Sequence, residues 1–129
     1  MKKAIIASVF ALAFSPATAQ AEGDAKKGKS VYGKCKACHD AVTEKNKIGP
    51  HLVSIVGRKA GVAKGYNYSA AMKKAGEAGL VWTDENLHKY IENPRKAMKG
   101  NKMPFPGLRQ KSDRDDLFAY LKTLKPAAK

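Results

Sequence analysis

The sequence predicts one small all-α domain, with helices near both ends of the chain and long loops between them. Segments near the two ends place apolar residues at the three- and four-residue steps of an amphipathic helix. The intervening stretch 40–67 is rich in glycine, which is typical of loops. A chain of 129 residues allows one domain with a small core. A core of this size gains stability from any apolar group that binds only the folded chain.

The first predicted helix runs from Asp24 to about Cys35. Ala25, Gly28 and Val31 share one face of this segment with its last residue. A glycine inside a helix costs about 1 kcal/mol relative to alanine. We therefore expect that another helix approaches closely at Gly28.

The later helices are predicted from their caps and breakers. A short helix is expected over Ser69–Ala75 and is expected to end at Gly76. Thr83 is a candidate N-cap for the next helix, which should stop before Pro94. In the last helix, Ser112 and Asp115 form a capping-box-like start, Pro126 is the stop, and the expected buried residues are Leu117, Tyr120, Leu121 and Leu124.

The N-terminus resembles a secretory signal peptide. Lys2 and Lys3 precede an apolar run over Ala4–Phe14 that is too short to span a bilayer. The segments 17–19 and 19–21 both fit the small-x-small rule for cleavage. We expect residues 1–21 to be removed, which leaves residues 22–129 as the domain, exported to the periplasm. The alternative is an uncleaved membrane anchor.

The pentapeptide Cys35-Lys36-Ala37-Cys38-His39 is the attachment motif of a c-type haem. Two thiols three residues apart on one turn can each add to a haem vinyl group. The histidine that follows can then supply a ring nitrogen to the iron. These are the chain's two cysteines, so the sequence predicts one covalently bound haem c.

Two other interpretations of the cysteine pair are weaker. A redox-active C-x-x-C disulfide is expected beside a βαβ pattern, and no strand-like run flanks the motif. A structural zinc site needs four ligands, and His51 and His88 show no paired ligand spacing.

A second haem ligand is expected on the loop Lys102–Gly107. Its prolines exclude a regular helix or central strand, and Met103 has no helical periodicity that would place it in a core. A thioether is a soft ligand, and Met/His ligation raises the redox potential. Met72 lies in a helical pattern, where methionine usually fills gaps. Met98 remains a competitor on spacing alone.

The charge of the chain is strongly positive and unevenly distributed. Lys and Arg number 25 against 11 acidic residues, a formal net charge of +14. The stretch from Arg95 to Lys111 holds six basic residues and no acid, and Lys34 and Lys36 flank Cys35. Such a field steers association with an acidic partner.

Several further landmarks, in order along residues 23–125, resemble the class I c-type cytochromes, in the group of mitochondrial cytochrome c and short bacterial cytochrome c2. Beside the haem motif they are Gly23-Asp24, Gly28, Gly49-Pro50-His51-Leu52, residues 57–61, residues 65–68, Trp82, Tyr90, Asn93-Pro94, Lys102-Met103 and residues 116–121. The resemblance implies a cytochrome c domain in which the terminal helices cross, at Gly28 and Tyr120, and loops wrap one haem.

The resemblance also implies a role for each matching residue. Cys35 and Cys38 carry the thioether bonds, and His39 and Met103 are the axial ligands. The carbonyl of Pro50 accepts the other ring N–H of His39. Tyr90 packs beside the methionine sulfur, and the propionates are held by Arg58, Tyr68, Trp82 and Asn101. His51, where the family commonly has a small polar residue, is expected not to ligate.

These observations together predict a monomeric one-electron carrier that is not an enzyme. Its expected partners are acidic docking faces of membrane redox complexes, namely a bc1-type donor and a reaction centre or oxidase as acceptor. A haem enzyme, such as a peroxidase, would need an open position on the iron, and rapid cyanide binding would favour it. A nucleic-acid-binding module would share the basic charge, but the signal peptide and the haem motif oppose it.

Overall fold

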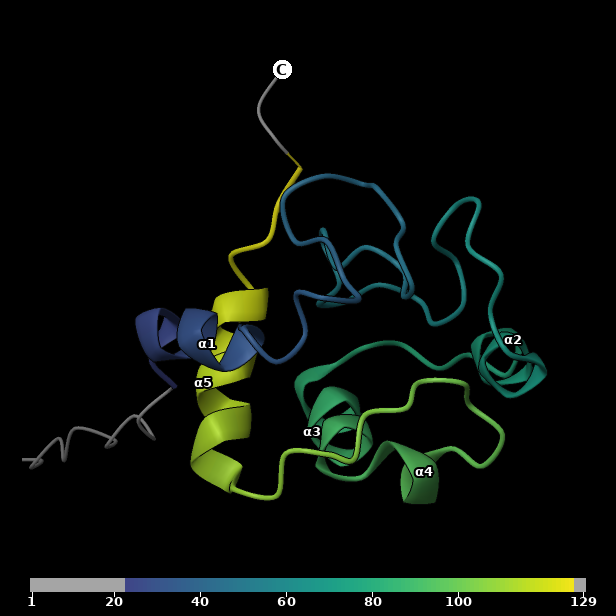
Figure 1. Ribbon diagram of the computed structural model, residues 1–129. Helices are drawn as coiled ribbons and strands as arrows, with labels where there is room; N and C mark the ends of the chain where they lie inside the picture. The colour runs from purple at the N-terminus through teal and green to yellow at the C-terminus, as the bar shows by residue number, and fades with distance from the viewer. Residues whose placement is uncertain (1–22, 127–129) are drawn as a thin grey trace, which may run out of the picture.

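Two helices from opposite ends of the chain cross one another in the computed structural model, which describes residues 23–126 (Figure 1). They are α1, Ala25–Tyr32, and α5, Lys111–Leu121. The three helices between them are α2, Ala70–Glu77, α3, Asp84–Glu92, and α4, Pro94–Ala97. Within the described range no strand forms, and one isolated bridge joins Lys59 to Val81. The predicted all-α class is confirmed, while the predicted signal peptide lies outside the described residues.

The crossing of α1 and α5 brings the two backbones into direct contact at Gly28. A Cβ atom on Gly28 would lie 1.9 Å from the carbonyl oxygen of Asp116 and 2.8 Å from the Cβ of Tyr120. The backbone N–H of Asp24 donates to the Asp116 carboxylate at 2.7 Å. Next to this contact, the Tyr32 and Tyr120 rings lie 5.3 Å apart. The expected close approach at Gly28 and Tyr120 is therefore confirmed.

Two helix ends differ from the prediction. The first helix ends at Tyr32 rather than near Cys35, and irregular turns continue to Cys38. The predicted stop at Gly76 is wrong, because α2 continues to Glu77. Gly76 is buried against the carbonyl of Ala60, 2.1 Å from where its Cβ would be, so it serves close packing instead. The positive φ of 96° that follows the helix belongs to Gly79.

The predicted capping box of the last helix is also wrong. Helix α5 starts before Ser112, with Gln110 at the N-cap and no side-chain cap bond. Asp115 instead pairs with Lys111, one turn earlier, at 2.7 Å. The α-helix stops at Leu121, and turns carry the chain on toward Pro126. As expected, Leu117, Leu121 and Leu124 are buried, whereas Tyr120 is half-buried.

The cap of α3 is confirmed, since the Thr83 side chain accepts from the N–H of Asn86 and the helix ends before Pro94. The short helix α4 was not expected. Pro94 is its first residue, a position where proline's missing N–H has no helical partner to lose. The Asn93 side chain caps it by accepting from the N–H of Lys96.

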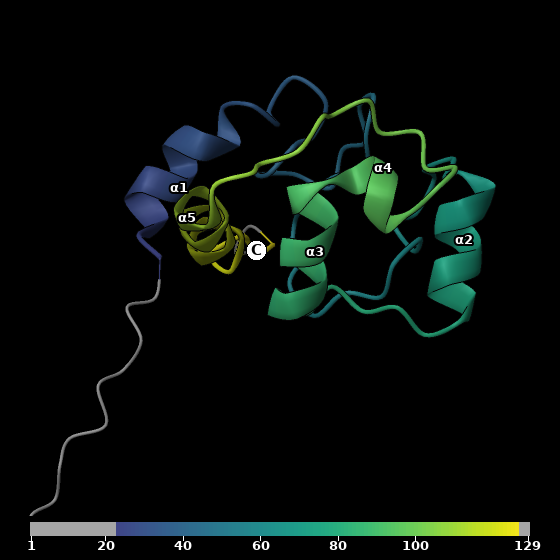
Figure 2. The same cartoon turned by 90° about the horizontal axis from the view of Figure 1, so that it is seen from below.

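The core lies between the crossed helices and α3. Leu87 and Tyr90 of α3, Leu117 of α5 and Trp82 belong to one buried cluster. Seen from below, α1 and α5 form one side of the molecule and α2 the opposite side, with α3 and α4 between them (Figure 2). Segment 98–110 runs from α4 across to α5. Among the described helices, none is long and apolar enough to cross a membrane.

Candidate haem site

The predicted attachment motif forms a single irregular turn directly after α1. The N–H of Cys38 and the N–H of His39 both donate to the carbonyl of Cys35, at 3.1 and 3.0 Å. Both cysteines are free thiols and half-buried. Burial, with a smaller contribution from Cys38, raises the pKa of the Cys35 thiol to about 11. One turn therefore presents two thiols and a histidine, as the motif predicts.

The His39 ring is oriented by the loop opposite it. Its Nδ1 lies 2.7 Å from the carbonyl oxygen of Pro50. A Cβ atom on Gly49 would lie 2.4 Å from the ring's Cε1, so glycine leaves the ring its space. Desolvation lowers the pKa of His39, although the bond to Pro50 acts in the opposite direction. A neutral imidazole that donates from Nδ1 keeps its lone pair on Nε2, the form that binds a metal.

The loop that carries Met103 is irregular, as its prolines predict, and it packs against the core. The backbone N–H of Met103 donates to Oδ1 of Asn101 at 2.9 Å. Met98 is the C-cap residue of α4, where its carbonyl accepts from the Asn101 side chain. Met72 lies on α2. All three methionine side chains are half-buried against the core, so the choice of Met103 over Met98 stays a prediction.

Arg58 is half-buried, and one of its donors has no partner. Its two terminal nitrogens donate to the carbonyls of Val53, at 3.2 Å, and His51, at 2.9 Å. Its Nε is buried and has no hydrogen-bond partner. A buried N–H of a guanidinium without a partner is costly, and a carboxylate is the group that best satisfies it. This unpaired donor fits a haem propionate.

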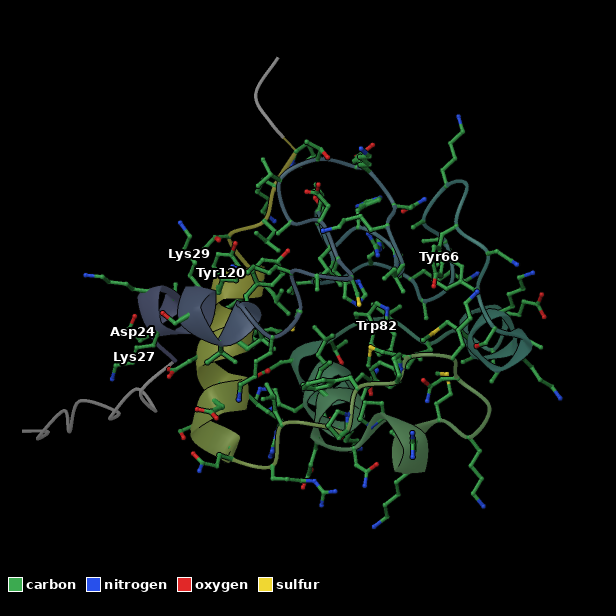
Figure 3. All side chains as sticks on the ribbon, in the orientation of Figure 1. Asp24, Lys27, Lys29, Tyr66, Trp82 and Tyr120 are labelled. Carbon is green, nitrogen blue, oxygen red and sulfur yellow. The ribbon has the colours of Figure 1, made fainter. Side chains whose placement is uncertain are left out.

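The remaining predicted site residues differ in how far their polar groups are engaged. Trp82 lies at the centre of the molecule (Figure 3), with its ring 5.0 Å from that of Tyr90. Burial raises the pKa of the Tyr90 hydroxyl to about 12. The Tyr68 hydroxyl accepts from the N–H of Ala63 at 3.0 Å, which leaves its own O–H free to donate. Asn101 instead has both amide protons donated to backbone carbonyls.

Three contacts at the site were not foreseen. His51 is buried, and its Nδ1 lies 3.4 Å from a terminal nitrogen of Arg58. Burial and the Arg58 charge lower the pKa of His51, which favours its neutral form beside that cation. The sequence signal for this contact was that histidine stands at position 51, where the family commonly has a small polar residue. The ammonium of Lys102 lies over the Tyr66 ring at 4.9 Å and reaches the carbonyl of Asn67, which no local pattern indicates.

Arg114 is the third, and it fastens the far end of the Met103 loop. One terminal nitrogen donates to the carbonyls of Leu108 and Arg109, each at 2.8 Å. The side chain is largely buried and also lies 3.9 Å from the Glu92 carboxylate. A basic residue one turn before the buried Leu117 was the only sequence signal for this role.

Comparison with known proteins shows which family the chain resembles. The family model named Cytochrome c matches residues 25–125. A cytochrome c2 of Agrobacterium tumefaciens (strain II Chrys) is 49% identical over 102 residues, which are 78% of this chain and 91% of that protein. A cytochrome c2 of Rhodomicrobium vannielii is 44% identical over 124 residues, 95% of this chain and 97% of that protein. The solved structure of cytochrome cH from Methylobacterium extorquens superposes with a TM-score of 0.72 at 45% identity, covering 78% of this chain and 99% of the other.

The chain therefore belongs to the cytochrome c family, and the predicted resemblance and fold are confirmed. Proteins of this family carry electrons on a covalently bound haem c, and the two cysteines stand here at the required spacing. The half-buried cysteines, the oriented histidine and the unpaired Arg58 donor fit that cofactor.

Proposed function

We propose that this protein moves one electron at a time between membrane redox complexes in the periplasm, with His39 and Met103 as the axial ligands of its haem. The observation that carries the proposal is the half-buried His39 ring, oriented by the Pro50 carbonyl so that Nε2 is left to bind iron. Gly49 packs against the ring on its other side, where a Cβ atom would lie 2.4 Å from Cε1.

When bound, the haem supplies an iron that alternates between the ferric and ferrous states. His39 and Met103 would hold the iron of the bound haem from the two ligand segments. Cys35 and Cys38 fix the group to the turn, while Arg58, Tyr68 and Trp82 hold its carboxylates. Tyr90, whose ring is tilted against that of Trp82, would pack beside the methionine sulfur, as its family position implies. A filled coordination sphere leaves no open position for a substrate, which supports a carrier rather than an enzyme.

The docking face is proposed from the basic residues near the two ligand segments. All are exposed: Lys34, Lys36, Arg95, Lys96, Lys99 and Lys102. Opposite charge steers diffusional encounter, and transient redox contacts are small. We propose that the monomer presents this face to acidic surfaces on a bc1-type donor and on a reaction centre or oxidase. Fractionation of cells and N-terminal sequencing of the mature chain would test export and the removal of residues 1–21.

The ligand assignment is tested by two methionine variants of the haem-loaded protein. Met103→Ala should abolish the methionine-to-iron charge-transfer absorption of the ferric form and lower the redox potential, because a thioether ligand raises it. Met98→Ala is the matched control, since that side chain is also half-buried against the core. Loss of the band in Met98→Ala, with Met103→Ala unchanged, would reverse the assignment.

A further inference from the structure

One amide side chain organises the loop that carries Met103. The Asn101 Nδ2 donates to the carbonyl of Pro94 at 2.9 Å and to the carbonyl of Met98 at 2.8 Å. On its other side, Oδ1 accepts from the backbone N–H of Met103 at 2.9 Å. The side chain thus joins α4, the turn after it and the residue proposed as the ligand.

These contacts use every proton that the amide can donate. An asparagine side chain has two N–H donors and one carbonyl oxygen. Both donors are directed to backbone carbonyls of this chain, so neither is left for a haem carboxylate. The role suggested by family position, a propionate donor, therefore does not match the contacts that Asn101 makes.

The carbonyls that receive these bonds are themselves well anchored. Pro94 is among the largest fully buried side chains, and its carbonyl also accepts from the N–H of Met98 at 3.0 Å. Gly100, with a φ of 86°, lets the chain turn so that the Asn101 side chain faces back toward α4. The Asn101 amide therefore ties the loop that carries Met103 to the well-packed start of α4. The loop itself has few backbone hydrogen bonds.

That lack of support is visible in the backbone hydrogen bonds of the loop. Within residues 102–107, all of which the structure describes, the N–H of Met103 is the backbone donor with a hydrogen-bond partner, and that partner is Asn101. Without Asn101 the next backbone bond is the one from the N–H of Leu108 to the carbonyl of Ile91, at 2.8 Å. The ligand's own backbone would then be untethered.

We propose that Asn101 is a positioning residue, which holds Met103 in place for the iron through its hydrogen bonds to Pro94, Met98 and the Met103 backbone. This inference rests on the proposed function, because it takes Met103 as the ligand. A tethered thioether competes well against other ligands, since little freedom is lost when it binds. When the tether is removed, an external ligand gains relative to Met103.

The test measures imidazole binding to the ferric haem-loaded protein. In Asn101→Ala, the three hydrogen bonds of the amide are lost, so the Met103 backbone loses its tether. We expect imidazole affinity to rise about tenfold or more, with a weaker methionine-to-iron charge-transfer band and a lower potential. Asn101→Ser, which keeps one acceptor and one donor, should restore part of the band.

A second variant separates the positioning role from a propionate contact. Asn101→Asp has nearly the same shape and keeps an oxygen for the N–H of Met103, but it turns an acceptor toward the carbonyls of Pro94 and Met98. A positioning role predicts the same rise in imidazole affinity as in Asn101→Ala. A change confined to the pH dependence of the potential, with imidazole affinity unchanged, would overturn the proposal.

Asn86→Ala is the matched control for general loss of stability. Its amide also donates to a backbone carbonyl, that of Val81, at 2.8 Å, but it lies in the first turn of α3 and its partner is outside the loop. Both alanine variants should lower the unfolding midpoint, and only Asn101→Ala should change imidazole affinity. Equal affinities in the two variants would refute the inference. Met103→Ala shows which of the two proposals has failed. If the charge-transfer band persists in Met103→Ala, the ligand assignment is wrong. If the band is lost in Met103→Ala while Asn101→Ala keeps the wild-type band and imidazole affinity, the ligand assignment stands and only the positioning role of Asn101 is wrong.

Discussion

The crossing of α1 with α5 and the loop that carries Met103 are stabilised in different ways. At the crossing, the backbone of Gly28 contacts the backbone at Asp116 directly. In the loop, a single side-chain amide holds the backbone of Met103. Backbone contact resists any added atom, whereas a hydrogen-bonded loop can open without disturbing the helices. The terminal helices thus set the global stability, and the loop sets how firmly the methionine is held.

Both regions contain a glycine that packs closely against a backbone carbonyl. Gly107 ends the loop as Gly28 centres the crossing, and a Cβ atom there would lie 2.2 Å from the carbonyl of Glu92. The loop is therefore fixed at Asn101 and again at Gly107 and Leu108. Between these points, Pro104, Phe105 and Pro106 have no described backbone hydrogen bond. A substitution that displaces the loop at either fixed point should therefore displace Met103, whereas one that displaces the crossing of α1 and α5 should not.

Gly28→Ala should give the largest effect on stability. The new Cβ would sit 1.9 Å from a backbone oxygen, so the helices must separate, at a cost of about 3 kcal/mol. Denaturant unfolding of the haem-loaded protein measures this change. Lys27→Ala, one residue earlier and exposed (Figure 3), should change the free energy of unfolding by about 0.5 kcal/mol or less. An equal loss in both variants would mean that the crossing is not close-packed.

Gly107→Ala should give a smaller loss of stability but a larger change at the methionine. The residue has a φ of 117°, and the added atom would clash with the Glu92 carbonyl, so we expect about 2 kcal/mol. Imidazole affinity should rise here and stay at the wild-type value in Gly28→Ala below its unfolding range. Gly79→Ala is the control. Its φ of 96° is also positive, but a Cβ atom there would have no atom beyond its chain neighbours within 4 Å. The comparison fails if Gly28→Ala weakens the methionine as much as Gly107→Ala does.

A charge reversal near the loop should change association more than one near the crossed helices. Lys96 on α4 is exposed and belongs to the proposed docking face, whereas Lys125 is exposed beyond α5. Lys96→Glu should slow the second-order reaction with a physiological partner about threefold to tenfold at low salt, with the difference shrinking as salt rises. Lys102 is less suitable, since reversing it would also break its contact with Tyr66. Equal slowing by Lys125→Glu would show that net charge alone steers the partner.

The smallest expected effect is an acid-dependent one at the start of α1. The backbone N–H groups of Lys27 and Lys26 hold the pKa of Asp24 below its usual 3.8. A lowered carboxyl pKa contributes stability above the unfolded value, and this contribution is lost as the pH falls through the folded value. Asp24→Asn keeps an N-cap but removes the charge, so its unfolding midpoint should fall less than that of the wild type between pH 5 and pH 2. Parallel curves for the two proteins would contradict this.

The haem-attachment site was predictable from the sequence, because its residues lie close together in the chain. Cys35, Cys38 and His39 lie in five residues, so a local turn is sufficient to bring them together. Helical periodicity likewise predicted that Leu117 and Leu121 of the last helix are buried, as is Leu124 after its end. Gly28 could be interpreted because a glycine inside a helix needs a reason. Each of these features depends on neighbours within a few positions, which is the range over which sequence patterns carry information.

Only the tertiary structure decided features that depend on groups distant in the sequence. Gly76 does not end α2. It is needed because the carbonyl of Ala60, distant in the sequence, packs directly against it. Ser112 does not cap α5, since the helix start is fixed by the approach of the loop before it, where Arg114 binds the carbonyls of Leu108 and Arg109. Asn101 faces α4 rather than being left free, because Pro94 and Met98 offer it two carbonyls. The sequence by itself determined the haem motif, the helical class and the faces that are buried. Hydrogen-bond partners between separate segments were decided only by the folded chain, since a side chain bonds whichever group the fold brings within about 3 Å.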